Sequence, residues 1–315
     1  MPSLPTRPGY GLTWAKTILV GEHSVVYGHP AVALPLHDLR MEATARPVDG
    51  PPRLRSLGYD GPMDAAGARF ACVVRAYQAA RDAAGTSQDF EITTSSGFPY
   101  ERGLGSSAAA AGAVIRAVLD ACGREASAAE LFELTQTAER VAHEHPSGLD
   151  ARATCAPGPI RFQQGQMRPL RQRVEAVLVI ADSGVQGSTR EAVGGLRRRY
   201  DATPATIAPL VDRLGSLTET AIAALGAGDP ARLGAAMDQA HQTLAELGLS
   251  LPVLDRLVDT ARQAGALGAK LTGGGLGGCL IALTSDDHTD QVRQGLDQAG
   301  AAQTWTYQIR TSEDT

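Results

Sequence analysis

The sequence predicts an α+β protein of two domains, and three observations support this prediction. The chain has 315 residues, whereas one domain usually takes roughly 100–200 residues. Short apolar runs rich in β-branched residues alternate with longer segments of helical periodicity. Near residues 182–190 the composition shifts towards long amphipathic helices. We therefore predict one domain over residues 1–185 and a second over residues 186–315.

The first half is expected to begin with strands and to continue with helices. Strands are predicted at residues 17–20, 25–27, 31–34 and 90–94, with further strands and a long exposed loop over residues 40–61. Helices are predicted over residues 65–84 and 108–119, and from residue 127 towards His145. Asp64 is the expected N-cap of the first helix and Gly85 its stop, whereas Ser127 and Glu130 form a capping box for the third.

The second half is expected to hold long helices between strands. Strands are predicted at residues 174–181, 269–272, 279–283 and 304–309, and a glycine loop fills residues 273–278. Helices are predicted at residues 205–225, 230–247, 252–263 and 286–298. Ser188 should cap one further helix, and Pro230 and Pro252 stand at helix starts.

The composition is that of an ordinary globular protein, with 43% hydrophobic and 20% charged residues. A net charge of −5 argues against nucleic-acid binding, because no face rich in Lys and Arg is implied. The four cysteines form no C-x-x-C pair, so we expect reduced thiols. No long apolar run is present, so we expect a cytoplasmic location and no membrane span.

A glycine-rich turn runs directly into an alanine-rich helix at residues 103–111. The first N–H groups of a helix lack intrahelical partners and lie at the positive end of its dipole, which suits a phosphate. Gly103 and Gly105 allow close approach to the backbone, and Ser106 and Ser107 offer hydroxyls. The loop lacks the lysine of a Walker A motif and the third glycine of a dinucleotide turn. A helix cap without a ligand is the alternative interpretation.

Other polar groups could complete a phosphate site. Glu139 with Asp150 would suit Mg²⁺ and a general base, since Mg²⁺ prefers oxygen ligands. His143 and His145 have no third His or Cys nearby, which disfavours zinc. Of the 29 basic residues only Lys16 and Lys270 are lysines. Either these two positions need a compact ammonium group in place of a guanidinium, or the presence of lysine there is chance. Glu22 and His23 stand at a strand end, as a surface pair or as part of a site.

Four segments together resemble the GHMP kinases and, within them, the mevalonate kinase family. They are KTILVGEHSVVYGHPAVALPL at residues 16–36, ERGLGSSAAAA at 101–111, HPSGLD at 145–150 and KLTGGGLGGCLIAL at 270–283. The resemblance implies a ribosomal-protein-S5-like α/β N-terminal domain and a ferredoxin-like α+β C-terminal domain. It also implies ATP-dependent phosphorylation of the 5-hydroxyl of mevalonate, a step of isoprenoid biosynthesis.

The resemblance further implies a role for each matching residue. Asp150 would be the general base and Lys16 would assist it and polarise the hydroxyl. The remaining implied roles are ATP-phosphate contacts at Gly103, Leu104, Gly105, Ser106 and Ser107, Mg²⁺ ligands at Ser107 and Glu139, and a mevalonate site lined by Lys16, Glu22, His23 and Asp150. The expected partners are mevalonate and ATP, without nucleic acid or membrane, and a homodimer is left open.

Two alternatives remain open at this point. The same fold could phosphorylate phosphomevalonate, a sugar or homoserine, and these branches differ chiefly around residues 21–23 and 188–189. A non-catalytic sensor could instead bind ATP and a small ligand. The presence of both Lys16 and Asp150 argues against a sensor, because phosphoryl transfer needs a charge-stabilising group and a proton acceptor.

Overall fold

The computed structural model describes residues 7–142 and 147–311. The chain forms two compact units, each assembled from separate stretches of sequence. Unit 1 comprises residues 1–16, 35–100 and 105–156, and unit 2 comprises residues 17–34, 101–104 and 157–315. The two predicted domains, residues 1–185 and 186–315, are continuous in sequence. The two compact units are not, so they do not test a domain boundary at residue 185, which remains a prediction.

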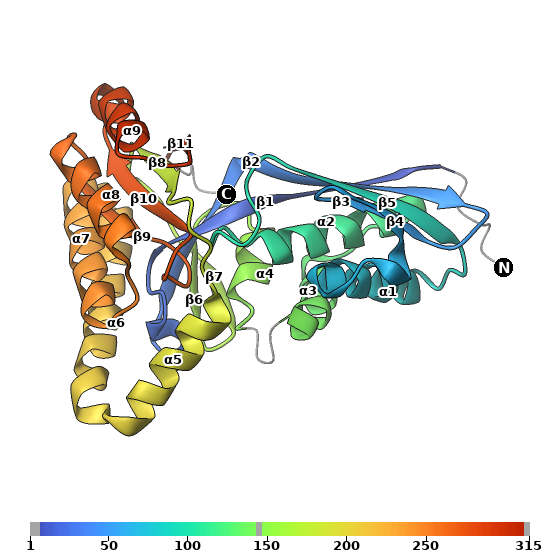
Figure 1. The fold of residues 1–315 in the computed structure, drawn as a ribbon, viewed down its shortest axis with the longest axis horizontal. Helices are drawn as coiled ribbons and strands as arrows, with labels where there is room; N and C mark the ends of the chain where they lie inside the picture. The colour runs from blue at the N-terminus through green and yellow to red at the C-terminus, as the bar shows by residue number, and fades with distance from the viewer. Residues whose placement is uncertain (1–6, 143–146, 312–315) are drawn as a thin grey trace. The chain divides into compact units, whose positions relative to one another are not determined.

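Unit 1 combines a β-sheet with helices packed on one side of it (Figure 1). Its strands are parts of β1 (Gly9–Val20) and β2 (Ala31–Val48), followed by β3 (Arg53–Ser56), β4 (Tyr59–Pro62) and β5 (Asp89–Ser96). β5 pairs antiparallel with β2 and parallel with β3, and β3 forms a hairpin with β4. The helices are α1 (Ala71–Ala84), α2 (Ser106–Ala121), α3 (Ala128–Ala142) and the short α4 (Leu149–Ala153).

Small residues let β1 lie directly on α2. A Cβ at Gly11 would lie 1.9 Å from Ala113 O, and a Cβ at Gly9 would lie 2.1 Å from Ala117 O. Only glycine fits at such a close approach of two backbones. Strand and helix therefore run past each other in opposite directions, which brings the C-terminal end of this strand segment to the N-terminus of α2.

Unit 2 contains a four-stranded antiparallel sheet in the order β11-β8-β10-β9. Its strands are β8 (Ala176–Asp182), β9 (Gly268–Leu271), β10 (Cys279–Thr284) and β11 (Gln303–Ile309). The helices are α5 (Thr189–Ala202), α6 (Pro204–Ala227), α7 (Pro230–Glu246), α8 (Pro252–Gln263) and α9 (Thr289–Gln298), of which α7, α8 and α9 pack on the sheet. The βαββαβ order with this pairing is ferredoxin-like, as predicted. A second hairpin, β6 (Ile160–Gln163) with β7 (Gln166–Pro169), pairs through β6 with residues 31–33 of β2.

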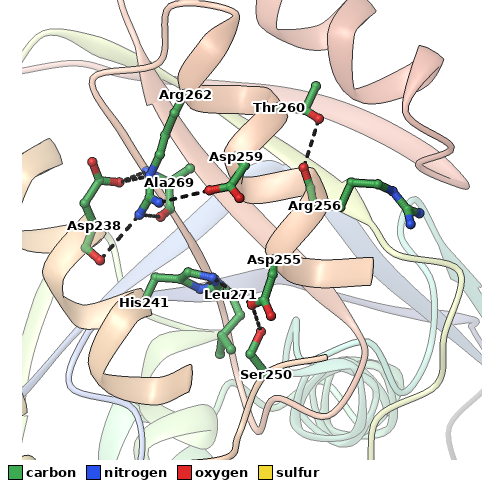
Figure 2. Close-up of polar contacts among 10 residues, drawn as sticks. All are labelled: Asp238, His241, Ser250, Asp255, Arg256, Asp259, Thr260, Arg262, Ala269 and Leu271. Carbon is green, nitrogen blue, oxygen red and sulfur yellow. Dashed lines mark hydrogen bonds and ion pairs between the residues drawn. The ribbon is translucent and has the colours of Figure 1, made fainter. Parts of the chain in front are cut away.

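Side chains from α7 satisfy the outer edge of β9, which is the edge strand of this sheet (Figure 2). Ala269 N–H donates to Asp238 Oδ1 at 2.8 Å, and Leu271 N–H donates to His241 Nδ1 at 3.3 Å. His241 Nε2 lies 3.2 Å from Asp255 Oδ1, and burial lowers the pKa of His241 to about 4. A neutral ring can accept at Nδ1 while it donates at Nε2, so α7 fixes the strand that leads into the glycine loop.

Most predicted elements are confirmed, and the exceptions occur where local geometry overrides residue preference. Residues 25–27 are not a strand but part of a 3-10 helix, η1 (Ser24–Tyr27), because the chain turns sharply through positive φ at Gly21 and His23. The first helix begins at Ala71 rather than residue 65, since Gly67 at φ 74 interrupts the chain between two 3-10 turns. Asp64 therefore lies in η2 (Met63–Ala65) and is not an N-cap.

Two smaller corrections concern the remaining segments. The long loop expected within residues 40–61 is instead the end of β2 followed by the β3–β4 hairpin. The helix predicted over residues 286–298 starts with a 3-10 turn, η4 (Asp286–His288), before α9. The predicted cap Ser188 is confirmed, since it accepts a hydrogen bond from Glu191 N–H. Asp229 caps α7 in the same way and accepts from Arg232 N–H. None of the described helices is long and apolar enough to cross a membrane.

Candidate active site

Lys16 and Asp150 form an ion pair in unit 1. Lys16 lies in β1 and is 2% exposed, and its Nζ is 3.0 Å from Asp150 Oδ1. Asp150 belongs to the first turn of α4, which begins after Gly148 at φ 88. Its side chain is 40% exposed, so the carboxylate is held by the ammonium and still accessible to a small molecule.

The N-terminus of α2 meets this ion pair. Gly105 precedes the helix at φ 72, and the first intrahelical hydrogen bond runs from Ala109 N–H to Gly105 O at 2.9 Å. The earlier N–H groups lie at the positive end of the helix dipole. A Cβ at Gly105 would lie 2.8 Å from Lys16 Cγ, so the glycine makes room for the lysine. The helix end that is predicted to bind phosphate and the Lys16–Asp150 pair are therefore neighbours within unit 1.

A second polar group in unit 1 joins α2 to α3. Ser107 Oγ donates to Glu139 Oε1 at 2.6 Å, and Cys72 Sγ donates to the same oxygen at 3.2 Å. Glu139 is 4% exposed, and burial raises the pKa of the Cys72 thiol, which therefore keeps its proton and can donate it. A hydroxyl and a carboxylate side by side at a helix N-terminus are hard oxygen donors. This donor set fits Mg²⁺, which binds few protein oxygens and shares its remaining sites with phosphates and water.

In unit 2, residues 102–103 of the glycine-rich turn pack on the glycine loop at residues 273–278 and on its flanking strand ends. Gly103 stands at φ 83, and a Cβ there would lie 2.8 Å from Thr272 O. Cys279 N–H donates to Arg102 O at 3.0 Å, and Arg102 Nε lies 3.1 Å from Asp182 Oδ2. Backbone contacts at this spacing require glycine, so the two loops hold each other in place.

His23 adopts a strained conformation in unit 2, with φ 61 and ψ −47. Such backbone strain in a non-glycine residue is of the order of 1–3 kcal/mol and concentrates at functional sites. His23 Nε2 lies 2.9 Å from Gly274 O, and because a carbonyl only accepts, Nε2 must carry the proton. Burial lowers the pKa of His23 to about 4. The buried Nδ1 has no hydrogen-bond partner among the described residues and is therefore an available acceptor.

Glu22 and Lys270 form a buried ion pair next to this histidine. The Glu22 side chain is 1% exposed and that of Lys270 0%. Lys270 Nζ donates to Glu22 Oε1 and also to Leu271 O at 2.6 Å and to Ile18 O at 3.4 Å. The ammonium therefore fixes the segment that precedes His23.

The predicted site residues gather in two groups, one in each unit. Those in unit 1 are Lys16, Gly105, Ser106, Ser107, Glu139 and Asp150, and those in unit 2 are Glu22, His23, Gly103 and Leu104. Leu104 is 0% exposed, so its side chain belongs to the core and only its backbone is suited to a phosphate. Two residues considered from the sequence, His143 and His145, lie outside the described residues.

The sequence did not assign a role to two residues that contact the site. Lys270 pairs with Glu22, and its rarity as a lysine among 27 arginines was the available signal. Cys72 contacts Glu139 across 67 positions of sequence, and no motif pointed to it. The role of such residues depends on folded geometry.

Two family models of the GHMP kinases match this chain. The family model of the GHMP kinases N terminal domain matches residues 71–158, and that of the GHMP kinases C terminal matches residues 221–302. These two segments lie in order along the chain and include α2, α4 and β9, which carry much of the site.

Whole-chain relatives narrow this class. The mevalonate kinase of Pyrococcus horikoshii is 33% identical over 291 residues, covering 85% of this chain and 86% of that protein. That of Aeropyrum pernix is 32% identical over 312 residues, covering 95% and 94%. The crystal structure of L. major mevalonate kinase in complex with R-mevalonate is similar at a TM-score of 0.87 and 26% identity, covering 100% of this chain and 99% of that one. The chain therefore belongs to the GHMP kinase family, within its mevalonate kinase group.

Proposed function

We propose that this enzyme transfers the γ-phosphoryl group of ATP to the 5-hydroxyl of mevalonate, with Asp150 as general base and Lys16 beside it. The observation that carries the proposal is the Lys16–Asp150 pair at 3.0 Å, next to the N-terminus of α2. The choice of mevalonate as substrate is supported by the family, since the similar L. major enzyme has R-mevalonate bound.

The chemistry divides between the two members of the pair. The mevalonate 5-hydroxyl oxygen forms a bond to the γ-phosphorus as the bond from that phosphorus to the ADP oxygen breaks, and the hydroxyl proton passes to the Asp150 carboxylate. The Lys16 ammonium orients this carboxylate and stabilises negative charge on the reacting oxygens. Phosphoryl transfer depends mainly on such positioning and charge stabilisation.

The phosphates of ATP fit the N-terminal end of α2. Backbone N–H groups at residues 103–107 and the hydroxyl of Ser106 are the proposed contacts. Ser107 and Glu139 would hold Mg²⁺, which would neutralise phosphate charge when bound. The fit rests on two oxygen donors already joined by a 2.6 Å hydrogen bond at this helix end.

The neutral His23 ring is suited to a hydroxyl group of the substrate. Its Nε2–H is used by Gly274 O, so Nδ1 can accept a hydrogen bond from an alcohol. A buried acceptor that gains a partner on binding contributes both affinity and discrimination. Glu22 was predicted to line the same site, and we retain that assignment as part of the proposal.

A cavity of about 360 Å³ in unit 1 is a candidate for the purine base. It is lined by Met63, Gly67, Ala71, Val74 and Val141, with Asp64, Ala68, Arg75 and Gln78 completing the wall. Ala71 directly precedes Cys72, whose thiol contacts Glu139. An apolar cavity with a few polar groups beside a phosphate site suits a flat heterocycle.

The test is ADP release with Mg-ATP and a panel of alcohols: mevalonate, phosphomevalonate, galactose and homoserine. Mevalonate should be turned over best, and preference for another member would assign the enzyme to a different branch of the family. The Asp150→Asn variant should lose about 10²–10⁴-fold in kcat, the usual contribution of a general base, while binding ATP normally. Near-normal turnover would refute the base assignment.

Location in the cytoplasm and assembly as a homodimer are further parts of the proposal. Cell fractionation would test the first and light scattering of the purified protein the second.

A further inference from the structure

The turn at residues 21–24 is held in a conformation that its sequence does not favour. His23 is a non-glycine residue in the region of positive φ, and strain of this kind persists only where surrounding contacts enforce it. Within the turn, Ser24 N–H donates to Glu22 O at 2.6 Å, which closes the backbone across His23, and Ser24 Oγ donates to Gly21 O at 3.3 Å. These local bonds do not hold the side chains of Glu22 and His23, whose contacts come from elsewhere in unit 2.

Two contacts from one distant segment flank the strained residue. The Lys270 ammonium binds the carboxylate of Glu22, just before His23, and Gly274 O accepts from His23 Nε2 at 2.9 Å. Both partners belong to residues 270–274, the end of β9 and the start of the glycine loop. One contact fixes the backbone ahead of the histidine, and the other fixes the rotation of its ring.

A lysine suits this position better than an arginine. The ammonium carries three N–H donors on a compact head, and it serves Glu22 Oε1, Leu271 O and Ile18 O. A planar guanidinium directs its donors into a fixed fork, which does not match three acceptors converging on one atom. The chain nevertheless uses arginine for 27 of its 29 basic residues, and its other lysine, Lys16, also pairs with a carboxylate.

The segment that carries Lys270 is itself rigidly attached. On either side of Lys270, the N–H groups of Ala269 and Leu271 donate to Asp238 and His241 of α7 (Figure 2). Arg262 Nε lies 2.7 Å from Asp238 Oδ1, which connects α8 to the same anchor. Lys270 therefore projects from a strand fixed along its outer edge.

We propose that Lys270 is a positioning residue for substrate binding: through Glu22 it holds the strained turn that aims His23 Nδ1 at the alcohol substrate. This inference rests on the proposed function for the identity of that substrate. Glu22 then acts as an anchor of the turn in addition to any contact with the substrate itself.

The experiment compares the double variant Glu22→Met/Lys270→Met with the wild-type enzyme. Removing both charges avoids leaving one buried ion unpaired, so the double variant should fold where Lys270→Met alone would be strongly destabilised. We expect the KM for mevalonate to rise about tenfold, as for the loss of one neutral hydrogen bond, with the KM for ATP within about twofold. Because Glu22 also lines the proposed mevalonate site, a rise in this KM does not by itself separate a positioning role from a direct contact, and the tautomer of the His23 ring decides between them.

A second readout needs no substrate. In ¹⁵N-histidine spectra the wild-type His23 ring should show a single tautomer with the proton on Nε2, assigned by its absence from a His23→Gln variant. In the double variant the ring should populate both tautomers, because the turn no longer presents it to Gly274 O. If this double variant does not fold, Glu22→Gln/Lys270→Met keeps the side-chain volume at residue 22, leaves no buried ion unpaired and should shift the tautomer in the same direction.

A matched control removes another ion pair of unit 2. Arg161 contacts Glu219 through two nitrogens, at 3.0 and 2.8 Å, and Arg161→Met should leave the His23 spectrum and the KM for mevalonate unchanged. A wild-type His23 spectrum and a wild-type KM in the charge-deleted variant would overturn the positioning role. If wild-type enzyme fails to phosphorylate mevalonate, the proposed function fails, while the spectra still decide the role of Lys270.

Discussion

Substitution of Gly105 by alanine tests how closely the start of α2 constrains Lys16. Gly105 has φ 72, and a Cβ there would lie 2.8 Å from Lys16 Cγ, 3.0 Å from Lys16 Cε and 3.2 Å from Thr154 Cγ2. The left-handed backbone alone should reduce the free energy of unfolding by about 1–2 kcal/mol. The overlap also forces the nearly buried lysine to move, and misplacement of a catalytic group by about 1 Å can lower the rate about 10²-fold.

Gly123 provides the matched control for this substitution. It also belongs to unit 1, has φ 69, and a Cβ there would meet no described atom within 4 Å. Urea unfolding should show a loss of stability for both variants, larger for Gly105→Ala because of the overlap, whereas kcat with mevalonate should fall only for Gly105→Ala. Wild-type kcat in Gly105→Ala, or an equal loss of kcat in both variants, would refute the assigned geometry of Lys16.

Three further predictions concern the proposed metal site and the buried histidines. Glu139→Gln should raise the free Mg²⁺ concentration for half-maximal rate at least about tenfold, and an unchanged Mg²⁺ titration would remove Glu139 from the metal site. Ser107→Ala should act in the same direction, measured in the same way, since Ser107 Oγ bonds Glu139 at 2.6 Å. The pKa values of His23 and His241 are lowered to about 4, so unfolded chains bind more protons below pH 6.5 and stability should fall as pH drops towards 4, by up to about 1.4 kcal/mol per pH unit for each ring. When the free energy of unfolding is measured with urea at several pH values between 6.5 and 5, it should depend less steeply on pH in His241→Gln than in the wild type. An unaltered dependence on pH would contradict a buried neutral ring at His241.

The elements that sequence predicted well are those with strong local signals. The alanine-rich run after Gly105 predicted α2, and the prolines at residues 230 and 252 predicted the starts of α7 and α8. The predicted bounds of these helices agree with the structure within a residue or two. Caps and periodicity act over a few residues, so they can be read without knowing the fold. The strand wrongly predicted at residues 25–27 shows the limit of this approach, because Val25, Val26 and Tyr27 prefer strands and only the turn before them excludes one.

The candidate site was predictable to the extent that its residues lie in recognisable motifs. The glycine and serine residues at 103–107 indicate an anion site from local chemistry alone. The pairing of Lys16 with Asp150 joins residues far apart in sequence, and only the resemblance of whole segments to a family suggested it. The short helix α4 (Leu149–Ala153) that presents Asp150 was not predicted, since five residues are too few to show helical periodicity.

The Lys270–Glu22 pair shows why part of such a site escapes sequence reasoning. The two residues are 248 positions apart, and each alone has an ordinary explanation as a surface charge. Only burial turns them into a constraint, because a charge without water must be paired in a defined geometry. The scarcity of lysine was a compositional sign that an ammonium is required, yet composition cannot tell which carboxylate it meets. In the folded chain β9 is fixed along one edge and a strained histidine lies beside the pair, and on this geometry the proposed link between the buried charge and substrate recognition rests.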